Sequence, residues 1–95
     1  MMSLIQYLIC DKTKNADNKT ANTATFINCS VAHAPTGLPN TGVNNFTFYV
    51  NGQNLVIGII SFVQVGNDLV LTIDNEIVGY EFNQSDEVTA YGKFN

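Results

Sequence analysis

The amino-acid sequence predicts an all-β protein, an antiparallel β-sandwich or small barrel with an N-terminal hairpin or arm and long polar loops. Short runs of β-forming residues alternate with turn signals along the 95 residues, and no segment shows convincing 3.6-residue periodicity. Asn51-Gly52 places two residues that tolerate positive φ between two such runs, which is the strongest short-range signal of a hairpin. A chain of this length forms one domain with a thin core, so we expect partners to help stabilise it.

The first third of the chain contains two predicted strands, residues 4–9 and residues 24–32. Between them, residues 11–23 are polar and carry three of the four lysines, so we expect a solvated loop there. We therefore interpret residues 1–32 as an N-terminal arm or hairpin, whose apolar first strand is suited to adding to a sheet edge of a neighbour. Residues 33–45 combine two prolines with two glycines and are expected to form a long surface loop.

Residues 46–95 are predicted to form an antiparallel β module within the same single domain. Gly58 lies inside a Val- and Ile-rich run and is a candidate for a bulge or a close backbone contact. Turns are expected at residues 66–68 and 74–76. The predicted strands cover residues 46–50, 55–65, 69–73, 77–82 and 88–94.

Most aromatic side chains of this module occupy the inward phase of the alternation and are expected in the core: Phe46, Phe48, Phe62, Tyr80, Phe82 and Phe94. Tyr49 and Tyr91 lie on the opposite phase of their strands, so they are candidates for an interface or for stacking on a sugar. With the apolar N-terminal residues Leu4, Ile5 and Tyr7, they form the predicted interface set.

The charge composition argues against several classes of partner. Only 13% of the residues are charged, the formal net charge is −4, and all four basic residues are lysines. Nucleic-acid binding needs clustered Lys and Arg, so we expect no nucleic-acid partner. No stretch approaches the roughly 18–20 apolar residues of a membrane helix, and the N-terminus lacks the basic region and cleavage site of a signal peptide. Neutral, Asn-rich surface loses less on desolvation than charged surface, which favours a subunit interface.

Residues capable of catalysis or metal binding are sparse, and we expect no catalytic residue, cofactor or metal. The single histidine, His33, lies in the Pro/Gly segment, where few neighbours could orient it. Cys29 and His33 have zinc-like spacing but lack a second close-spaced ligand pair. Asp74 with Glu76, and Asp86 with Glu87, are interpreted as solvated turns. Whether Cys10 and Cys29 form a disulfide stays open at this point, although a reducing cytoplasm would keep them as thiols.

Five short segments of the second half carry a resemblance to a known group of proteins. They are residues 48–53 (Phe-Tyr-Val-Asn-Gly-Gln), 66–73 (Gly-Asn-Asp-Leu-Val-Leu-Thr-Ile), 79–80 (Gly-Tyr), 86–88 (Asp-Glu-Val) and 92–94 (Gly-Lys-Phe). In these segments the chain resembles small virion structural proteins of tailed phages, particularly phages of aquatic bacteria. The resemblance covers about residues 46–95 and rests on hairpin motifs, not on a catalytic signature. It implies a capsid decoration, neck, tail or fibre component that adds to a lattice without performing a reaction.

The expected function is therefore that of a capsid decoration or cement protein, which is not an enzyme. It would stabilise the major capsid shell by strand pairing and interface burial, in a virion assembled in the host cytoplasm. The expected partners are the major capsid protein or other virion subunits, together with further copies of the chain. The alternative is a neck, tail or fibre component, in which Tyr49 and Tyr91 bind host glycans.

Overall fold

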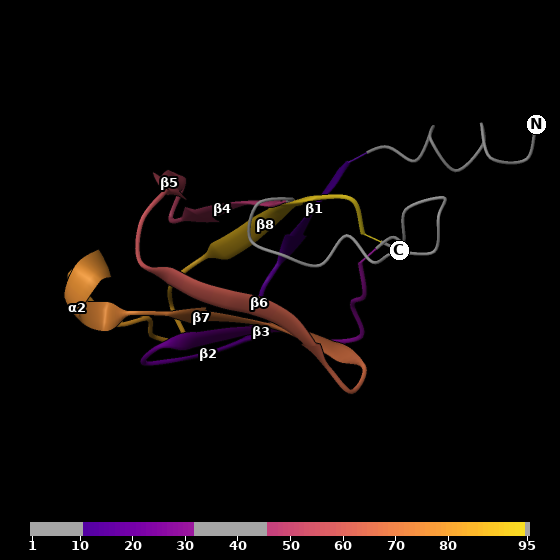
Figure 1. Cartoon of the computed structure of the whole chain (residues 1–95), viewed down its shortest axis with the longest axis horizontal. Helices are drawn as coiled ribbons and strands as arrows, with labels where there is room; N and C mark the ends of the chain where they lie inside the picture. The colour runs from indigo at the N-terminus through magenta and orange to yellow at the C-terminus, as the bar shows by residue number, and fades with distance from the viewer. Residues whose placement is uncertain (1–10, 32–45, 95) are drawn as a thin grey trace, which may run out of the picture.

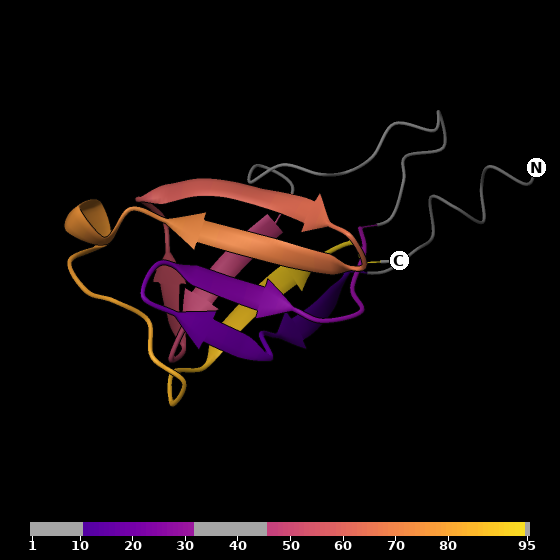
Figure 2. The same ribbon diagram turned by 90° about the horizontal axis from the view of Figure 1, so that it is seen from below.

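A computed structural model describes residues 11–31 and 46–94, and it shows two four-stranded antiparallel sheets packed as a sandwich (Figures 1 and 2). Sheet A has the strand order β1-β8-β4-β5, and sheet B has the order β2-β3-β7-β6. The elements are β1 (Lys12–Asn15), β2 (Asn18–Thr20), β3 (Thr23–Phe26), β4 (Phe46–Val50), β5 (Gln53–Leu55), β6 (Ile59–Val65), β7 (Asp68–Ile73), the short helix α2 (Asn75–Val78) and β8 (Val88–Gly92). The predicted all-β class is confirmed, and the architecture is the sandwich.

Both sheets combine strands from the first third of the chain with strands from the second half. In sheet A, β1 pairs with β8 and brings Lys14 opposite Ala90. In sheet B, β3 pairs with β7 and brings Ala24 opposite Leu71. Figure 2 shows β2 and β3 lying beside β7 in one layer. The described part of residues 1–32 is thus built into the two sheets.

The core lies between the sheets and is rich in phenylalanine. Phe62 on β6 is at its centre, with its ring centroid 5.8 Å from that of Phe26, 5.0 Å from Phe46 and 4.9 Å from Phe48, all in edge-to-face geometry. Such pairs contribute about 0.5–1.5 kcal/mol each beyond the burial of their area. Five of the six aromatic residues predicted to be inward are buried. The prediction is wrong for Tyr80, which is 43% exposed because it follows α2 and belongs to no strand.

The prediction of a polar loop at residues 11–23 is wrong, because this segment forms β1 and β2. All four residues of β1 are exposed, and β2 is exposed apart from the partly covered Lys19. Both are edge strands, and they pair through their backbones without burying a row of apolar side chains. The hydrophobic alternation that identifies half-buried strands is therefore missing from their sequence.

The long apolar run at residues 55–65 does not form one strand. Leu55 ends β5 in sheet A and Ile59 begins β6 in sheet B, so the chain crosses between the sheets at residues 56–58. Gly58 has φ +83°, and a Cβ built on it would lie 2.5 Å from Cγ2 of Val78. The predicted close backbone contact at Gly58 is thus confirmed, and it lies at the crossing. The register between β6 and β7 shifts between Ile59 and Ser61.

The prediction of a β-strand at residues 77–82 is also wrong. Residues Asn75–Val78 form one helical turn, which begins after Asp74 and ends at Gly79 with φ +94°. The Asp74 carboxylate accepts hydrogen bonds from the backbone N–H groups of Glu76 and Ile77, at 3.0 and 3.3 Å. This N-cap satisfies helix donors locally, so a segment rich in β-formers becomes a turn of helix.

Two further predictions concern chain reversals and segment ends. The Asn51-Gly52 hairpin is confirmed: φ is +52° at Asn51 and +83° at Gly52, and Val50 pairs with Gln53. The strand predicted for residues 24–32 is shorter than expected, since β3 ends at Phe26 and Val31 forms an isolated bridge with Phe94. The strand predicted at residues 4–9 and the loop at residues 33–45 lie outside the described residues.

Candidate docking surface

The four outer strands of the two sheets differ sharply in length and chemistry. β1 has four residues with exposed Lys12 and Lys14, β2 has three residues with Lys19, and β5 consists of Gln53, Asn54 and Leu55. β6 spans seven residues, Ile59–Val65, none of them charged. Natural proteins protect sheet edges with short strands, lysine or proline, because an open edge is a template for pairing with another strand. β6 lacks these protections, apart from the register shift near its start.

Exposed aliphatic side chains accompany this unprotected edge. Ile60, Val63 and Val65 of β6 are 60%, 46% and 57% exposed, and Val56 and Ile57 just before the strand are 73% and 62% exposed. We call these five residues the β6 patch. Single exposed aliphatic residues are ordinary on protein surfaces, but several of them along one uncharged edge strand make this strand a candidate interaction site. The opposite phase of the same strand buries Phe62, so one strand contributes both to the core and to this patch.

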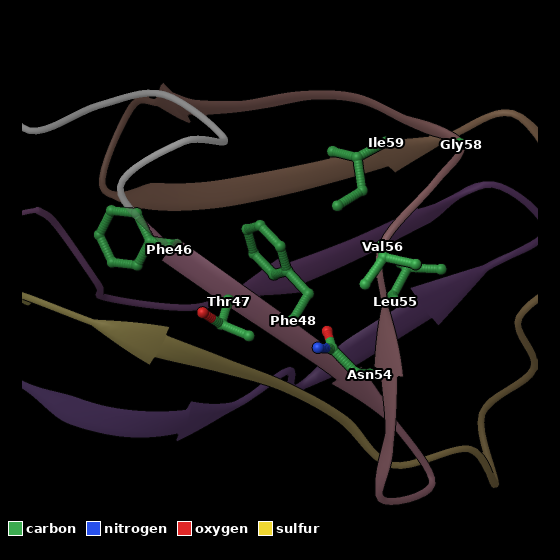
Figure 3. A pocket seen from close by; sticks show the side chains of 8 residues that line it. All are labelled: Phe46, Thr47, Phe48, Asn54, Leu55, Val56, Gly58 and Ile59. Carbon is green, nitrogen blue, oxygen red and sulfur yellow. The ribbon is translucent and has the colours of Figure 1, made fainter.

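A groove opens beside the patch, between β4 and the beginning of β6. It has a volume of about 380 Å³, and its lining includes Phe46, Phe48, Leu55, Val56, Gly58 and Ile59. Figure 3 shows the Phe48 ring and the Ile59 side chain extending into the same space from opposite walls. We call it the β4–β6 groove.

The short length of β5 explains why this groove exists. β5 pairs with β4 only from Phe48 to Val50. Phe46 and Thr47 are paired with β8 on their other side, through Gly92 and Tyr91. Within the described residues, therefore, no strand covers the flank of β4 at Phe46 and Thr47. The chain leaves sheet A after Leu55, before it could pair with these two residues.

Hydrogen bonds around α2 fix the far end of the groove. The backbone N–H of Asp74 donates to the carbonyl of Gly58 at 2.7 Å, which ties the crossing to the end of β7. The Asn75 side chain donates to the carbonyls of Ala21 and Tyr80, at 2.8 and 3.1 Å, and so joins α2 to the turn between β2 and β3. The crossing that lines this end of the groove is thus held to the end of β7.

A second hollow, of about 400 Å³, lies at the end of the sandwich near the Asn51-Gly52 turn and is polar. The Asp86 carboxylate there accepts hydrogen bonds from the Asn83 backbone N–H at 2.9 Å and from the Asn51 side chain at 3.1 Å. These two bonds hold the pKa of Asp86 below its ordinary value, the backbone bond being the larger cause. Partial burial, helped by the Asp86 charge, raises the pKa of Tyr80 nearby. The carboxylate serves to close the turn at residues 83–86.

The other chemically active groups also have local structural roles. Asp17 accepts from the Ile27 backbone N–H at 2.8 Å, and Asp68 accepts from that of Asn28 at 3.0 Å. Cys29 is a free thiol whose pKa is raised mainly by burial, which disfavours the nucleophilic thiolate. Across residues 11–31 and 46–94, no group of three or more His, Cys, Asp or Glu side chains could hold a metal ion. Cys10 and His33 lie outside the described residues.

The sequence-predicted interface residues fall on a different surface from the β6 patch. Tyr91 is 41% exposed and Tyr49 is half-buried, and both lie on the outer face of sheet A. Tyr91 stands opposite Thr47, and Tyr49 opposite Thr89, which donates a hydrogen bond to Asn15 at 2.8 Å. Within the paired strands this face carries Thr, Asn and Tyr side chains, and the ion pair between Lys93 and Asp11, at 2.7 Å, lies just beyond the strand ends next to Tyr91. Leu4, Ile5 and Tyr7 lie outside the described residues.

The β6 patch itself was not predicted from the sequence. A usable signal was present, because residues 55–65 are apolar on both phases of the strand without any charge. In a sandwich whose strands bury one face only, the second apolar phase must reach solvent. That inference requires knowing that the strand is at an edge and that no other described segment covers its outer face.

Comparisons with known proteins identify no relative: no protein family, curated protein or solved structure matches this chain significantly. Among the described residues, no helix is long and apolar enough to cross a membrane.

Proposed function

We propose that this protein is a virion structural protein, a capsid decoration or cement protein that docks on the major capsid shell through the β6 edge. The observation that carries the proposal is the uncharged seven-residue edge strand with its exposed Ile60, Val63 and Val65. A decoration protein must bind a repeated surface in many copies, and an open edge supports this by backbone pairing.

Strand pairing and apolar burial would act together at this edge. Backbone N–H and C=O groups on the free side of an edge strand form the ladder hydrogen bonds, while alternate side chains enter pockets of the partner. Burying apolar surface contributes about 25 cal/mol for each Å² removed from water. The β6 patch supplies such surface next to the ladder.

The virion setting is supported by the resemblance of residues 46–95 to small virion structural proteins of tailed phages. The net charge of the chain is consistent with this setting, since a chain with net charge −4 and no arginine suits the outer surface of a shell better than an inner surface that faces DNA. The major capsid protein is the proposed partner, and no reaction is assigned to the chain.

The decisive test adds the purified chain to phage particles that lack it and measures bound copies by quantitative mass spectrometry. We expect binding in many copies per particle and increased resistance of the shell to heat. Val63→Lys should abolish binding, because it places a charge within the pairing surface. Ile77→Lys is the matched control, since Ile77 is 56% exposed, against 46% for Val63, but lies on α2 outside the β6 edge. Equal binding by both variants would disprove docking through β6.

A second candidate function, a tail or fibre component that binds glycans, is favoured by the outer face of sheet A. Tyr49 and Tyr91 stand there among Thr and Asn side chains, a combination of flat apolar rings and neutral hydrogen-bonding groups that suits sugars. A glycan array probed with the wild-type chain and with Tyr91→Ala tests it. Binding that depends on Tyr91, with few copies per particle, would favour this alternative.

A further inference from the structure

The β4–β6 groove has the properties of a site that accepts an extended strand. The flank of β4 at Phe46 and Thr47 is uncovered within the described residues, and β6 offers a second open edge on the other wall. The groove floor is formed by core side chains, including Phe46 and Phe48. A strand added along β4 would continue sheet A past the end of β5 and place every second side chain against this floor.

The lining determines which chemistry fits. Among the described residues that line the groove, aliphatic and aromatic side chains are the majority, Thr47 and Asn54 are polar, and none is charged. An uncharged apolar strand can enter it without burying an unpaired charge. A strand that carries Lys, Asp or Glu on its inward phase cannot.

Two segments of this chain lie outside the described residues and are long enough to be considered. Residues 33–45 contain two prolines, which lack the N–H groups needed for a ladder. Residues 4–9, Leu-Ile-Gln-Tyr-Leu-Ile, are uncharged and free of proline and glycine. The run has the required chemistry, and its six residues are one more than those of β4, so it can pair with the uncovered flank through part of its length.

The reach of the chain decides whose residues 4–9 can occupy the groove. Lys12, Gly92 and Phe46 are aligned across sheet A, so a strand added on the open flank of β4 would lie three strand spacings from Lys12, about 14 Å. Ile9 is three residues before Lys12 and can extend only about 10 Å from it. The complete run therefore cannot enter the groove of its own chain.

We propose that residues 4–9 of one copy add as a strand to β4 in the β4–β6 groove of a neighbouring copy. This deepens the proposed function, on which it rests, by naming the contact that links decoration subunits to one another. Gln6 is the polar residue of the run, so we assign the face of the strand that carries Gln6 to solvent. The opposite face, with Ile5, Tyr7 and Ile9, is assigned to the groove.

The first experiment measures the mass of the isolated full-length protein by sedimentation. The wild type is expected to associate through the groove, and Ile5→Lys should raise the dissociation constant by at least about tenfold. Gln6→Lys, one residue away on the opposite face, should associate like the wild type. On the groove side, Val56→Lys should also prevent association, whereas Ile77→Lys should not, because Ile77 does not line the groove. Val56 is 73% exposed, so its variant is expected to fold, which circular dichroism checks.

Mixing the two defective variants gives the sharpest result. Ile5→Lys retains an intact groove, and Val56→Lys retains an intact strand, so an equimolar mixture should form a heterodimer although each variant alone is monomeric. A pairing of two β6 edges around a two-fold axis would not be restored by mixing, and that outcome would overturn the proposal. A wild-type monomer at high concentration, or association unaffected by Ile5→Lys, would overturn it as well.

Particle binding separates this proposal from the function on which it rests. If Ile5→Lys still binds particles while the isolated wild type is monomeric, docking on the shell stands and the strand exchange between copies fails. If the isolated protein exchanges strands but never binds particles, the decoration role fails and the strand exchange stands.

Discussion

The edges of the sandwich at β1 and β6 show two opposite solutions to the same physical problem. Among the described residues, both strands have a partner strand on one side only, yet β1 is short and carries Lys12 and Lys14, while β6 is seven residues long and uncharged. Lysines on an edge make a neighbour's approach unfavourable, because the charge would be desolvated. The same fold therefore contains a protected edge and an open one, and the open one is where a partner is expected.

The largest predicted effect on the free energy of unfolding comes from the buried face of β6. Phe62→Ala should lower the free energy of unfolding by about 3–5 kcal/mol, because it leaves a cavity among three other phenylalanine rings. Denaturant unfolding followed by fluorescence or circular dichroism measures this loss. Val63→Ala, the neighbouring residue on the outer phase, should lose less than about 1 kcal/mol. Similar losses in the two variants would show that β6 does not separate a core face from a docking face.

The next effect concerns the crossing that creates the open edge. Gly58→Ala should lower the free energy of unfolding by about 2 kcal/mol or more, since positive φ is unfavourable for alanine and the new Cβ would meet Val78. Gly66→Ala is the matched control: φ is +61° there, but nothing lies within 4 Å of the new Cβ, so its loss should be near 1 kcal/mol. Thermal unfolding of both variants makes the comparison. A smaller loss at Gly58 than at Gly66 would contradict the tight packing of the crossing against α2.

A smaller, pH-dependent effect is expected at Asp86, which closes the turn beside the second hollow. Its pKa is lowered in the folded protein by the Asn83 and Asn51 hydrogen bonds, so the ionised form stabilises the fold. This contribution is complete above the unfolded pKa of about 3.9 and is lost as the pH falls through the lower folded value. Asp86→Asn should flatten the stability profile in this acidic range, as measured by unfolding at a series of pH values. An unchanged profile would show that other carboxyl groups determine the acid response.

The smallest effect on stability, and the most direct test of the edge comparison, is expected at β1. Replacing Lys12 and Lys14 together with valine should change the free energy of unfolding by no more than about 0.5 kcal/mol, because both side chains are exposed. The variant should nevertheless self-associate at lower protein concentration than the wild type, as light scattering would measure. Replacing the same lysines with glutamine is the control, since it removes the charge without adding apolar surface. Unchanged association of the valine variant would mean that the lysines do not protect this edge.

The sequence was most informative where side-chain alternation coincides with burial. The strand at residues 46–50, the Asn51-Gly52 hairpin and the inward phase of residues 88–94 follow from period-two patterns and turn chemistry. Exposed strands carry no such pattern, which is why the sequence predicts a loop where β1 and β2 lie. The helical turn α2 was missed because its stability comes from the Asp74 cap and from Asn75, which bonds to distant carbonyls.

By itself, the sequence determined the all-β class, the turns at glycine and asparagine, and the composition of the core, because these depend on local backbone preferences and on hydrophobic alternation. Only the tertiary structure decided which strands are at the edges, where the chain crosses between the sheets, and which flank of β4 stays uncovered among the described residues. Those features depend on pairings between distant residues, such as Lys12 with Gly92 and Phe62 with Leu71. A run of apolar residues has the same sequence signature in the centre of a sheet as at its edge, and only its neighbours distinguish core from docking surface.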